Sequence, residues 1–410
     1  MIQTLIVSLS ILALLLVVLE EKIHINKAKS TLFLGSLCWL IFYIYPDSGF
    51  DSHQITENLN ENLLEIASLW LFLMSAMTFV AYLNGKGFIS SLVQRVLPSQ
   101  ITERKLLIFL GLAAFLFSSL ADNVTATLVS VAVITQLRIS VRKQLKYAVL
   151  VVFAVNSGGV SLITGDVTTL MIFLADKVTI LSLLQLILPA IAGVLTLALL
   201  LSSNMSELVV LNTEKKPIHA ADKLIAVIFL LTIIATLTFN VLFNVPPVLT
   251  FLFGLSLMFL CGHFMHKPKT NPNVLNYIRE IEFDTLLFFL GILLIVGALK
   301  VLHVLDDIAL LYQYLPTSVA NYLLGIASAL IDNVPLTAAV LKANVNLTAT
   351  EWLSMTYAVG VGGSLLVIGS AAGIIAMSKV KELNFMSYLR MSFRLLLAYS
   401  VGYWLTVFML

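Results

Sequence analysis

Charged side chains are scarce in this sequence. Asp, Glu, Lys and Arg make up 11% of the 410 residues, whereas a typical soluble domain carries about 25%. The formal net charge is only +2, so no basic field indicates a nucleic acid as partner. Hydrophobic residues account for 60% of the chain. This composition excludes an ordinary soluble protein and predicts that a lipid bilayer surrounds most side chains.

Several chemical signatures are also missing. The two cysteines, Cys38 and Cys261, lie in apolar runs, so we interpret them as small core residues and not as a disulfide or metal pair. No Gly-rich loop ending in Lys-Ser or Lys-Thr is present, which argues against ATP as the energy source. No Gly-x-Ser-x-Gly arrangement indicates a hydrolase. We therefore expect neither an enzyme nor a bound cofactor.

Hydrophobic runs divide the chain into membrane-crossing segments, each of which needs about 20 apolar residues. The first run lacks a basic leader and a small-residue cleavage site, so we interpret it as a span and not as a cleaved signal peptide. The sequence predicts an all-α integral membrane protein with about ten transmembrane helices. Their windows are 3–20, 30–46, 64–84, 147–176, 179–203, 223–243, 247–264, 284–302, 352–380 and 386–409.

Two further apolar stretches, 106–137 and 318–342, are interrupted near the middle by an acid followed by an amide. The acid is Asp122 in the first stretch and Asp332 in the second. Basic residues favour the cytoplasmic side of a membrane. If the basic loops lie there, the first stretch enters and leaves from the cytoplasm, and the second enters and leaves from outside. Both stretches are therefore predicted to be re-entrant helical hairpins.

The same charge count sets the orientation of the whole chain. It places both termini and an acidic segment outside the cytoplasm, and the linker 204–222 inside it. The basic residues counted are Lys22, Lys27, Lys29, Lys86, Arg95, Arg104, Lys105, Arg138, Arg142, Lys143, Lys146, Lys215, Lys216, Lys223, His266, Lys267, Lys269, Lys379, Lys381, Arg390 and Arg394, and the acidic segment holds Asp47, Asp51, Glu57 and Glu61.

The two halves of the chain resemble each other at three places in the same order. The matched stretches are 65–73 with 282–290, 118–127 with 328–337, and 158–166 with 362–370. Five crossings in each unit is an odd number, so the second unit is inserted upside down. Inverted repeats with broken helices are typical of secondary transporters, whose site lies at the repeat interface.

The repeat predicts two units with the same parts. Gly-Gly runs at matched positions indicate a broken helix in each unit, although such glycines also serve close helix packing alone. The first unit is 1–203, with hairpin 106–137 and broken helix 147–176, and the second is 223–410, with hairpin 318–342 and broken helix 352–380.

Asp122 and Asp332 carry the predicted chemistry. A carboxylate at the centre of a bilayer costs several kcal/mol unless a cation or a proton neutralises it. These two states are the two half-cycles of an exchanger. The alternative is that each Asp only caps the N-terminus of a half-helix, as Asp and Asn often do.

Oxygen-bearing side chains accompany these acids, and hard cations prefer oxygen ligands. Single hydroxyls also bond commonly to their own helix, which is the structural alternative. Asp166 and Ser370 occupy matched positions, so the first half has the extra acid and is expected to bind its cation more tightly. The candidate ligands are Asp122, Asn123, Thr125, Asn156, Ser157, Asp166, Thr168, Thr169, Asp332, Asn333, Thr337, Ser364 and Ser370, with Na+ expected at Asp122, Asn123, Asp166, Asp332 and Asn333.

Glu65 and Glu282 lie at predicted membrane entrances, with Asp284 near the latter. They are candidates for relaying protons or steering cations. An equally good interpretation is that each acid stabilises a helix N-terminus through the helix dipole.

Four motifs characterise the chain as a whole. They read Asp122-Asn-Val-Thr-Ala-Thr, Asn156-Ser-Gly-Gly with Thr164-Gly-Asp-Val-Thr-Thr, Asp332-Asn-Val-Pro-Leu-Thr, and Gly362-Gly-Ser with Ile368-Gly-Ser-Ala-Ala-Gly. Together they resemble the NhaD-type sodium/proton antiporters, over nearly the whole chain. Many members have a Pro between the Gly-Gly and Gly-Asp motifs, whereas this chain has none there, so the helix break must rest on glycines.

The resemblance implies exchange of Na+ or Li+ for protons across a bacterial inner membrane, by a homodimer that moves in an elevator-like way. It assigns Glu65, Glu282 and Asp284 to the proton pathway and the following residues to ion binding: Asp122, Asn123, Thr125, Asn156, Asp166, Thr168, Thr169, Asp332, Asn333 and Ser370. The alternative is a Na+- or proton-coupled anion carrier of the dicarboxylate or arsenite type. The acids at both hairpin tips argue against it. A membrane scaffold or intramembrane enzyme is the third possibility.

Overall fold

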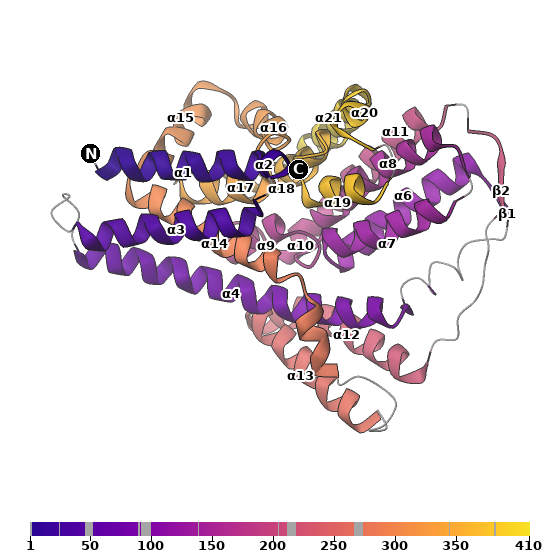
Figure 1. The fold of residues 1–410 in the computed structure, drawn as a ribbon, viewed down its shortest axis with the longest axis horizontal. Coiled ribbons are helices and arrows are strands. Elements are labelled where there is room, and N and C mark those ends of the chain that lie inside the picture. Colours follow the sequence, from indigo (N-terminus) through magenta and orange to yellow (C-terminus); the bar gives the residue numbers. More distant parts are fainter. Residues whose placement is uncertain are drawn as a thin grey trace.

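The computed structural model shows a protein built almost entirely of helices (Figure 1). It describes residues 2–23, 25–45, 52–88, 91, 100–137, 139–203, 205–210, 219–265, 274–343, 345–380 and 383–410. Several residues used in the orientation argument lie outside this described part. They are Asp47, Asp51, Arg95, Arg138, Lys215, Lys216, His266, Lys267, Lys269 and Lys381, together with residues 204 and 211–218 of the linker.

Six helices in the described part are long and apolar enough to cross a membrane, which confirms an all-α, multi-pass membrane protein. The number of about ten spans stays a prediction, because the other expected crossings are shorter helices or pairs of half-helices. The six segments are His53–Gly85, Ile180–Leu201, Ala220–Phe243, Pro247–Phe264, Phe283–Val301 and Ser392–Met409.

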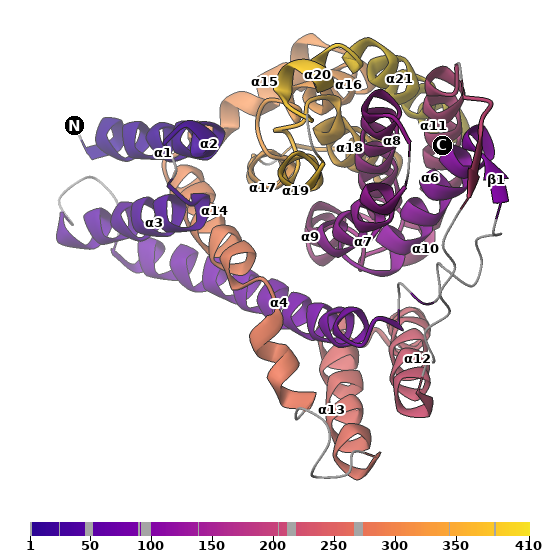
Figure 2. The same cartoon turned by 45° about the vertical axis from the view of Figure 1, so that its right-hand side comes forward.

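One group of helices, here called the frame bundle, is organised around the pair α3 and α14. Trp39 Nε1 on α3 donates to Leu294 O on α14, 2.9 Å away, and α4 crosses the same helix with Trp70 Nε1 donating to Leu286 O. Figure 2 shows α12 and α13 extending from α4. The frame bundle comprises α1 (Ile2–Val18), α3 (Lys27–Ile44), α4 (Ser52–Gly85), α12 (Ala220–Phe243), α13 (Pro247–Met265) and α14 (Phe283–Val301).

The second group, here called the hairpin bundle, packs α6 on α8, α16 on α18 and α11 on α21. Its helices are α6 (Glu103–Leu120), α7 (Asn123–Gln136), α8 (Val141–Gly159), α9 (Val167–Leu174), α10 (Ile180–Leu183), α11 (Ile187–Leu201), α16 (Thr317–Ala327), α17 (Asn333–Lys342), α18 (Ala349–Gly362), α19 (Ala371–Lys379), α20 (Phe385–Leu389) and α21 (Ser392–Met409). Short elements elsewhere are α2 (Glu20–Ile23), α15 (Asp307–Tyr314) and the 3-10 turns η1 (Leu184–Leu186), η2 (Val274–Glu280), η3 (Val304–Asp306) and η4 (Gly363–Leu365).

Helices α6 and α7 pack side by side and form a helical hairpin with its turn at Asp122. Both of its open ends lie at the start of α8, where Lys143 pairs with Glu103 at 2.7 Å and Gln144 Nε2 donates to Leu137 O at 3.2 Å. Helices α16 and α17 are joined by a similar turn at Asp332. In Figure 1 the chain enters α6 from the side of β1 and α16 from the side of α15, at opposite ends of the view.

The same contacts hold each hairpin against its neighbouring helix. Ser118 Oγ donates to Val155 O at 2.7 Å, and Ser328 Oγ donates to Val359 O at 2.9 Å. A Cβ added at Gly158 would lie 2.1 Å from Phe115 O, so only glycine permits this approach between backbones. Ser118, Ser328 and Gly158 belong to the stretches that the sequence comparison matched, whereas their partners lie just outside them.

The broken helices differ from the predicted boundaries only at their ends. The first begins at Val141 and is interrupted over 160–166, and the second begins at Ala349 and is interrupted between Gly362 and Ala371. No proline lies in the first interruption, in which Gly165 packs against the backbone of Gly159 and Ser118. Glycines therefore make the break, as expected.

Two sequence predictions need correction. Helix α4 begins at Ser52 and not at residue 64, so Glu57 and Glu61 are helical and not part of a polar loop. A helix satisfies its own backbone hydrogen bonds and can therefore continue beyond the apolar run into water. The described part also contains a two-stranded antiparallel ribbon of β1 (Gln100–Thr102) and β2 (Leu208–Val210). Three-residue strands are too short to leave a periodic signal.

Both cysteines are free, as predicted, and Cys38 is buried.

Candidate ion-binding site

Four helix N-termini meet around one cavity of about 230 Å³. Each starting helix is capped by a side chain that accepts a hydrogen bond from an N–H of the first turn: Asp122 for α7, Asp166 for α9, Asp332 for α17 and Ser370 for α19. Helix N-termini carry partial positive charge. Three carboxyl groups therefore stand where the helix dipoles favour negative charge.

Seven of the thirteen predicted ligands line this cavity, so the structure brings together residues more than 200 positions apart. They are Asp122, Asn123, Asn156, Asp166, Asp332, Asn333 and Ser370. The proton-pathway candidate Glu282 also lines the cavity.

The two halves of the chain interlock across the cavity. Asn333 Nδ2, from the second hairpin, donates to Asp166 Oδ2 of the first broken helix at 3.1 Å. Asn156 Nδ2, from the first broken helix, donates to Ser370 Oγ of the second at 3.1 Å. The site is thus shared between the halves and is not contained in either one.

Asp122 and Asp166 use their oxygens differently. Both oxygens of Asp122 are bound by Thr125, through its backbone N–H and its hydroxyl, each at 2.8 Å. Asp166 accepts from Thr168 N at 3.3 Å on one oxygen and from Asn333 on the other. Helix capping is therefore real at both acids. It does not exclude ion binding, because a carboxylate has about four acceptor sites.

Asn123 lies beside Asp166 at the first hairpin tip. With its nitrogen turned toward the neighbouring acceptors, Asn123 donates to Val155 O at 3.2 Å and to Gly165 O at 3.1 Å. Gly159 lies between Asn123 and Asp166 and leaves both side chains room, because any Cβ there would come within 3 Å of each. The amide of Asn123 is therefore held next to the carboxyl group of Asp166.

Several buried oxygens have no hydrogen-bond partner among the described residues. Among the predicted ligands these are Asn156 Oδ1, Ser157 Oγ and Thr168 Oγ1 in the first half and Thr337 Oγ1 in the second. Buried polar atoms in proteins normally have a partner. Of these four residues only Asn156 lines the cavity, so its amide oxygen is free to accept from a cation or an ordered water there.

The remaining predicted ligands do not line the cavity. Ser364 Oγ donates to Val361 O at 2.6 Å, which is the back-bond that transmembrane hydroxyls commonly make, and Thr169 Oγ1 donates across the helix break to Gly159 O at 3.3 Å. Thr125 reaches the site only through Asp122.

The three proton-pathway candidates have different surroundings. Glu282 caps α14 at the cavity and accepts from Thr285 Oγ1 at 3.2 Å. Asp284 accepts from Asn26 Nδ2 at 2.7 Å. Glu65 is half exposed, does not line the cavity and pairs with Lys342 on α17.

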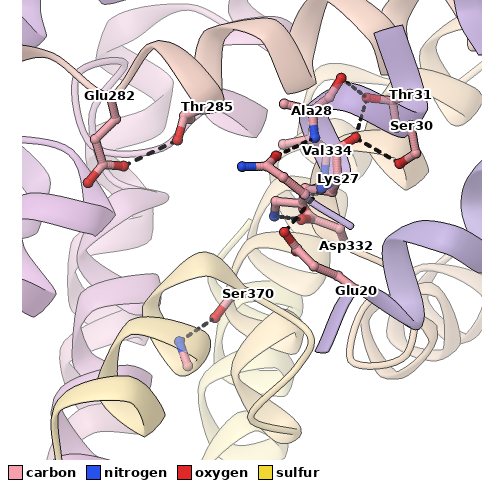
Figure 3. A network of polar contacts seen from close by, with 12 residues as sticks. Glu20, Lys27, Ala28, Ser30, Thr31, Glu282, Thr285, Asp332, Val334 and Ser370 are labelled. Atoms are coloured by element: carbon pink, nitrogen blue, oxygen red, sulfur yellow. Dashed lines mark hydrogen bonds and ion pairs between the residues drawn. The ribbon is translucent and has the colours of Figure 1, made fainter. Parts of the chain in front are cut away.

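Sequence reasoning missed Lys27 and Glu20 as residues of the cavity. Lys27 Nζ lies 3.2 Å from Asp332 Oδ2, and Glu20 Oε1 accepts from Lys27 N at 3.0 Å (Figure 3). In the sequence Lys27 counted only as one of several basic residues after the first span. No local pattern distinguishes it from Lys22 or Lys29, because only the packing of α3 against α14 brings it to the hairpin tip.

Among the described residues, no three His, Cys, Asp or Glu side chains are close enough to hold a metal ion together. The cavity therefore offers carboxyl oxygens together with amide and hydroxyl neighbours. Such a donor set suits a hard monovalent cation better than a tightly held transition metal.

Comparison with known proteins agrees with this donor set. The sequence model of the family described as "Citrate transporter" matches residues 9–362. The chain is 32% identical to the Na(+)/H(+) antiporter NhaD of Vibrio cholerae, covering 95% of this chain and 88% of that protein. It is 33% identical to the NhaD antiporter of Alkalimonas amylolytica, covering 92% and 84%, and 30% identical to Sodium/proton antiporter 2 of Arabidopsis thaliana, covering 92% of each. The chain therefore belongs to the NhaD family of transporters, within the broader family that the citrate-transporter model describes.

Proposed function

We propose that this protein exchanges Na+ or Li+ for protons across a membrane. The observation that carries the proposal is the convergence of Asp122, Asp166 and Asp332 on one cavity inside an apolar helical bundle. Relatives that match nearly the full chain are named sodium/proton antiporters, which supports the same function.

The proposed cycle is a competition for the same oxygen atoms. A cation that enters the cavity takes the carboxylate oxygens of Asp122 and Asp166, together with amide oxygens such as that of Asn123, and displaces a proton. When the cation leaves, a proton returns, because an isolated carboxylate in an apolar surrounding is costly. Asp332 and Asn333 complete the proposed set, and Glu282, on the cavity wall, is placed to pass the proton.

We further propose the arrangement in the membrane. The two halves form an inverted repeat of ten spans, with α6–α7 and α16–α17 as re-entrant hairpins and both termini outside the cytoplasm. Matched contacts at Ser118 and Ser328 support the repeat. The protein acts in the bacterial inner membrane as a homodimer in pH homeostasis, with the hairpin bundle moving against the frame bundle.

Exchange in everted membrane vesicles tests the function. A pH-sensitive dye is quenched by respiration, and then Na+, Li+ or K+ is added in parallel. We expect dequenching with Na+ and Li+ at alkaline pH, and none in Asp122→Asn vesicles with equal protein content. No dequenching by any cation in the unsubstituted protein would refute the proposal.

Labelled citrate or succinate uptake in the same vesicles tests the alternative. The family description names a citrate transporter, so anion carriage is the competing function. An anion site needs free positive groups, whereas this cavity has three Asp side chains and one Lys among its charged groups beside Glu20 and Glu282. Uptake of either anion driven by Na+ would replace the proposed function.

A further inference from the structure

We propose that the ammonium group of Lys27 is the resident counter-ion of Asp332, so that the transported cation loads only on the Asp122–Asp166 side of the cavity. The inference rests on the proposed function and narrows it. On this proposal Lys27, a residue of the frame bundle, determines how many cations the site binds.

The geometry places Lys27 firmly at the second hairpin tip. Its Nζ lies 3.2 Å from Asp332 Oδ2 (Figure 3). The same atom lies 4.4 Å from the centre of the Phe288 ring. The side chains of Lys27 and Asp332 are only 18% and 11% exposed. The backbone of Lys27 is fixed as well, by the hydrogen bond to Glu20 and by Asn26, which caps α3.

The pair is strong enough to compete with a sodium ion. The ammonium carries the same charge as Na+, and its short tether gives it an effective concentration of at least millimolar order. A ring face and a carboxylate stabilise it together. Leaving one partner of a buried ion pair unpaired is strongly unfavourable, so a sodium ion that displaced Lys27 would have to offset that cost.

The first half offers no equivalent. In the described part of the chain, Asp122 and Asp166 form no ion pair, and their oxygens are bound by neutral donors of Thr125, Thr168 and Asn333. In the proposed repeat, the start of α3 corresponds to the start of α13, where Pro247 stands in place of a lysine. The two hairpin tips thus carry the same acid, but among the described residues only Asp332 is paired with a basic side chain.

The charges around Lys27 fit a resident cation. Glu20 accepts from the backbone N–H of Lys27, and Glu20 and Glu282 line the same cavity as Asp332, so an acidic cavity surrounds one ammonium group. Asp332 therefore already has a cationic partner, whereas Asp166 has none among the described residues.

Counting bound sodium tests the inference. Purified full-length protein in nanodiscs is titrated with ²²Na+ at alkaline pH, and sites per chain are measured. We expect one site in the unsubstituted protein, two in Lys27→Met, which keeps the length and removes the charge, and one in Lys27→Arg, which restores a charge. One site in Lys27→Met, or two in the unsubstituted protein, would overturn the inference.

A charge-balanced double variant keeps the test decisive if Lys27→Met does not fold. Lys27→Met with Asp332→Asn leaves neither charge alone in the cavity, and we expect one sodium ion per chain. No bound sodium in the folded double variant would mean that Asp332 itself holds the transported ion. Failure of the proposed function looks different, because then the unsubstituted protein binds no sodium and exchanges none.

Discussion

The two sides of the cavity share a backbone plan and differ in charge. Each side has a hairpin tip, a broken helix and capping side chains at matched positions. The first side pairs Asp122 with a second acid, Asp166, and the second side pairs Asp332 with a hydroxyl, Ser370. The second side also receives Lys27 from the first unit of the repeat.

The difference shows how one backbone arrangement can carry two half-sites of different charge. Helix N-termini and released backbone groups come with the fold and are alike on both sides. The charge of each side depends on single side chains, which can change without disturbing the helices. We interpret the first side as the loading site and the second as its internally neutralised counterpart.

The largest expected effect comes from removing the acid that makes the sides unequal. Asp166→Asn should lower sodium-driven exchange by about 100-fold or more, because a charge-assisted contact worth about 3 kcal/mol is lost. Ser370→Ala, at the matched position, should lower it only a few-fold. Exchange in proteoliposomes measures both. Equal losses would show that the two sides contribute alike.

The next effect concerns helix packing and should be similar in the two halves of the chain. Gly158→Ala and Gly362→Ala each place a methyl group against a backbone carbonyl, of Phe115 and Gly325 respectively. Overpacking of this kind costs about 1–3 kcal/mol or more, so the melting temperature should fall by several degrees in both. Gly111→Ala is the control, because the added methyl group meets side-chain atoms of Leu150 and Val194 and not a backbone carbonyl. Destabilisation by one glycine variant alone would contradict matched packing.

A smaller effect is expected from the contact that crosses between the sides. Asn333→Ala removes the hydrogen bond to Asp166, and a bond to a charged group is worth about 1.5–3 kcal/mol. The KM for sodium should rise by about tenfold or somewhat more. Ser328→Ala removes a bond to the backbone carbonyl of Val359 and should leave KM as it is. An unaltered KM in Asn333→Ala would show that the second hairpin does not influence cation binding at Asp166.

The smallest effects distinguish two glutamates at matched positions. Glu282 lines the cavity, so Glu282→Gln should slow exchange several-fold. Glu65→Gln should change it less than twofold, because its half-exposed pair with Lys342 contributes only about 0.2–1 kcal/mol. Initial rates of exchange over a range of pH compare the two. A larger loss of exchange rate in Glu65→Gln than in Glu282→Gln would show that Glu65 takes part in the proton pathway.

The sequence predicted much of the arrangement of the candidate site because its motifs indicate where the helices are interrupted. Asp122 and Asp332 interrupt apolar runs, and the Gly-Gly motifs predicted the two helix breaks, so the convergence of hairpins and broken helices followed from pattern and repetition. The hydroxyls were less predictable. Ser364 bonds to the backbone of its own turn and Thr169 to the backbone of Gly159 across the helix break, a choice of partner that residue type does not reveal.

The sequence by itself determined the bilayer as solvent, the helical class and the matched acids, because hydropathy and spacing are local properties. Only the tertiary structure decided which charges meet. Lys27 reaches Asp332 across 305 positions, and Asn333 reaches Asp166 across 167. Such contacts depend on how helices pack in three dimensions, and a long side chain at the start of a helix can point to any neighbour that packing provides.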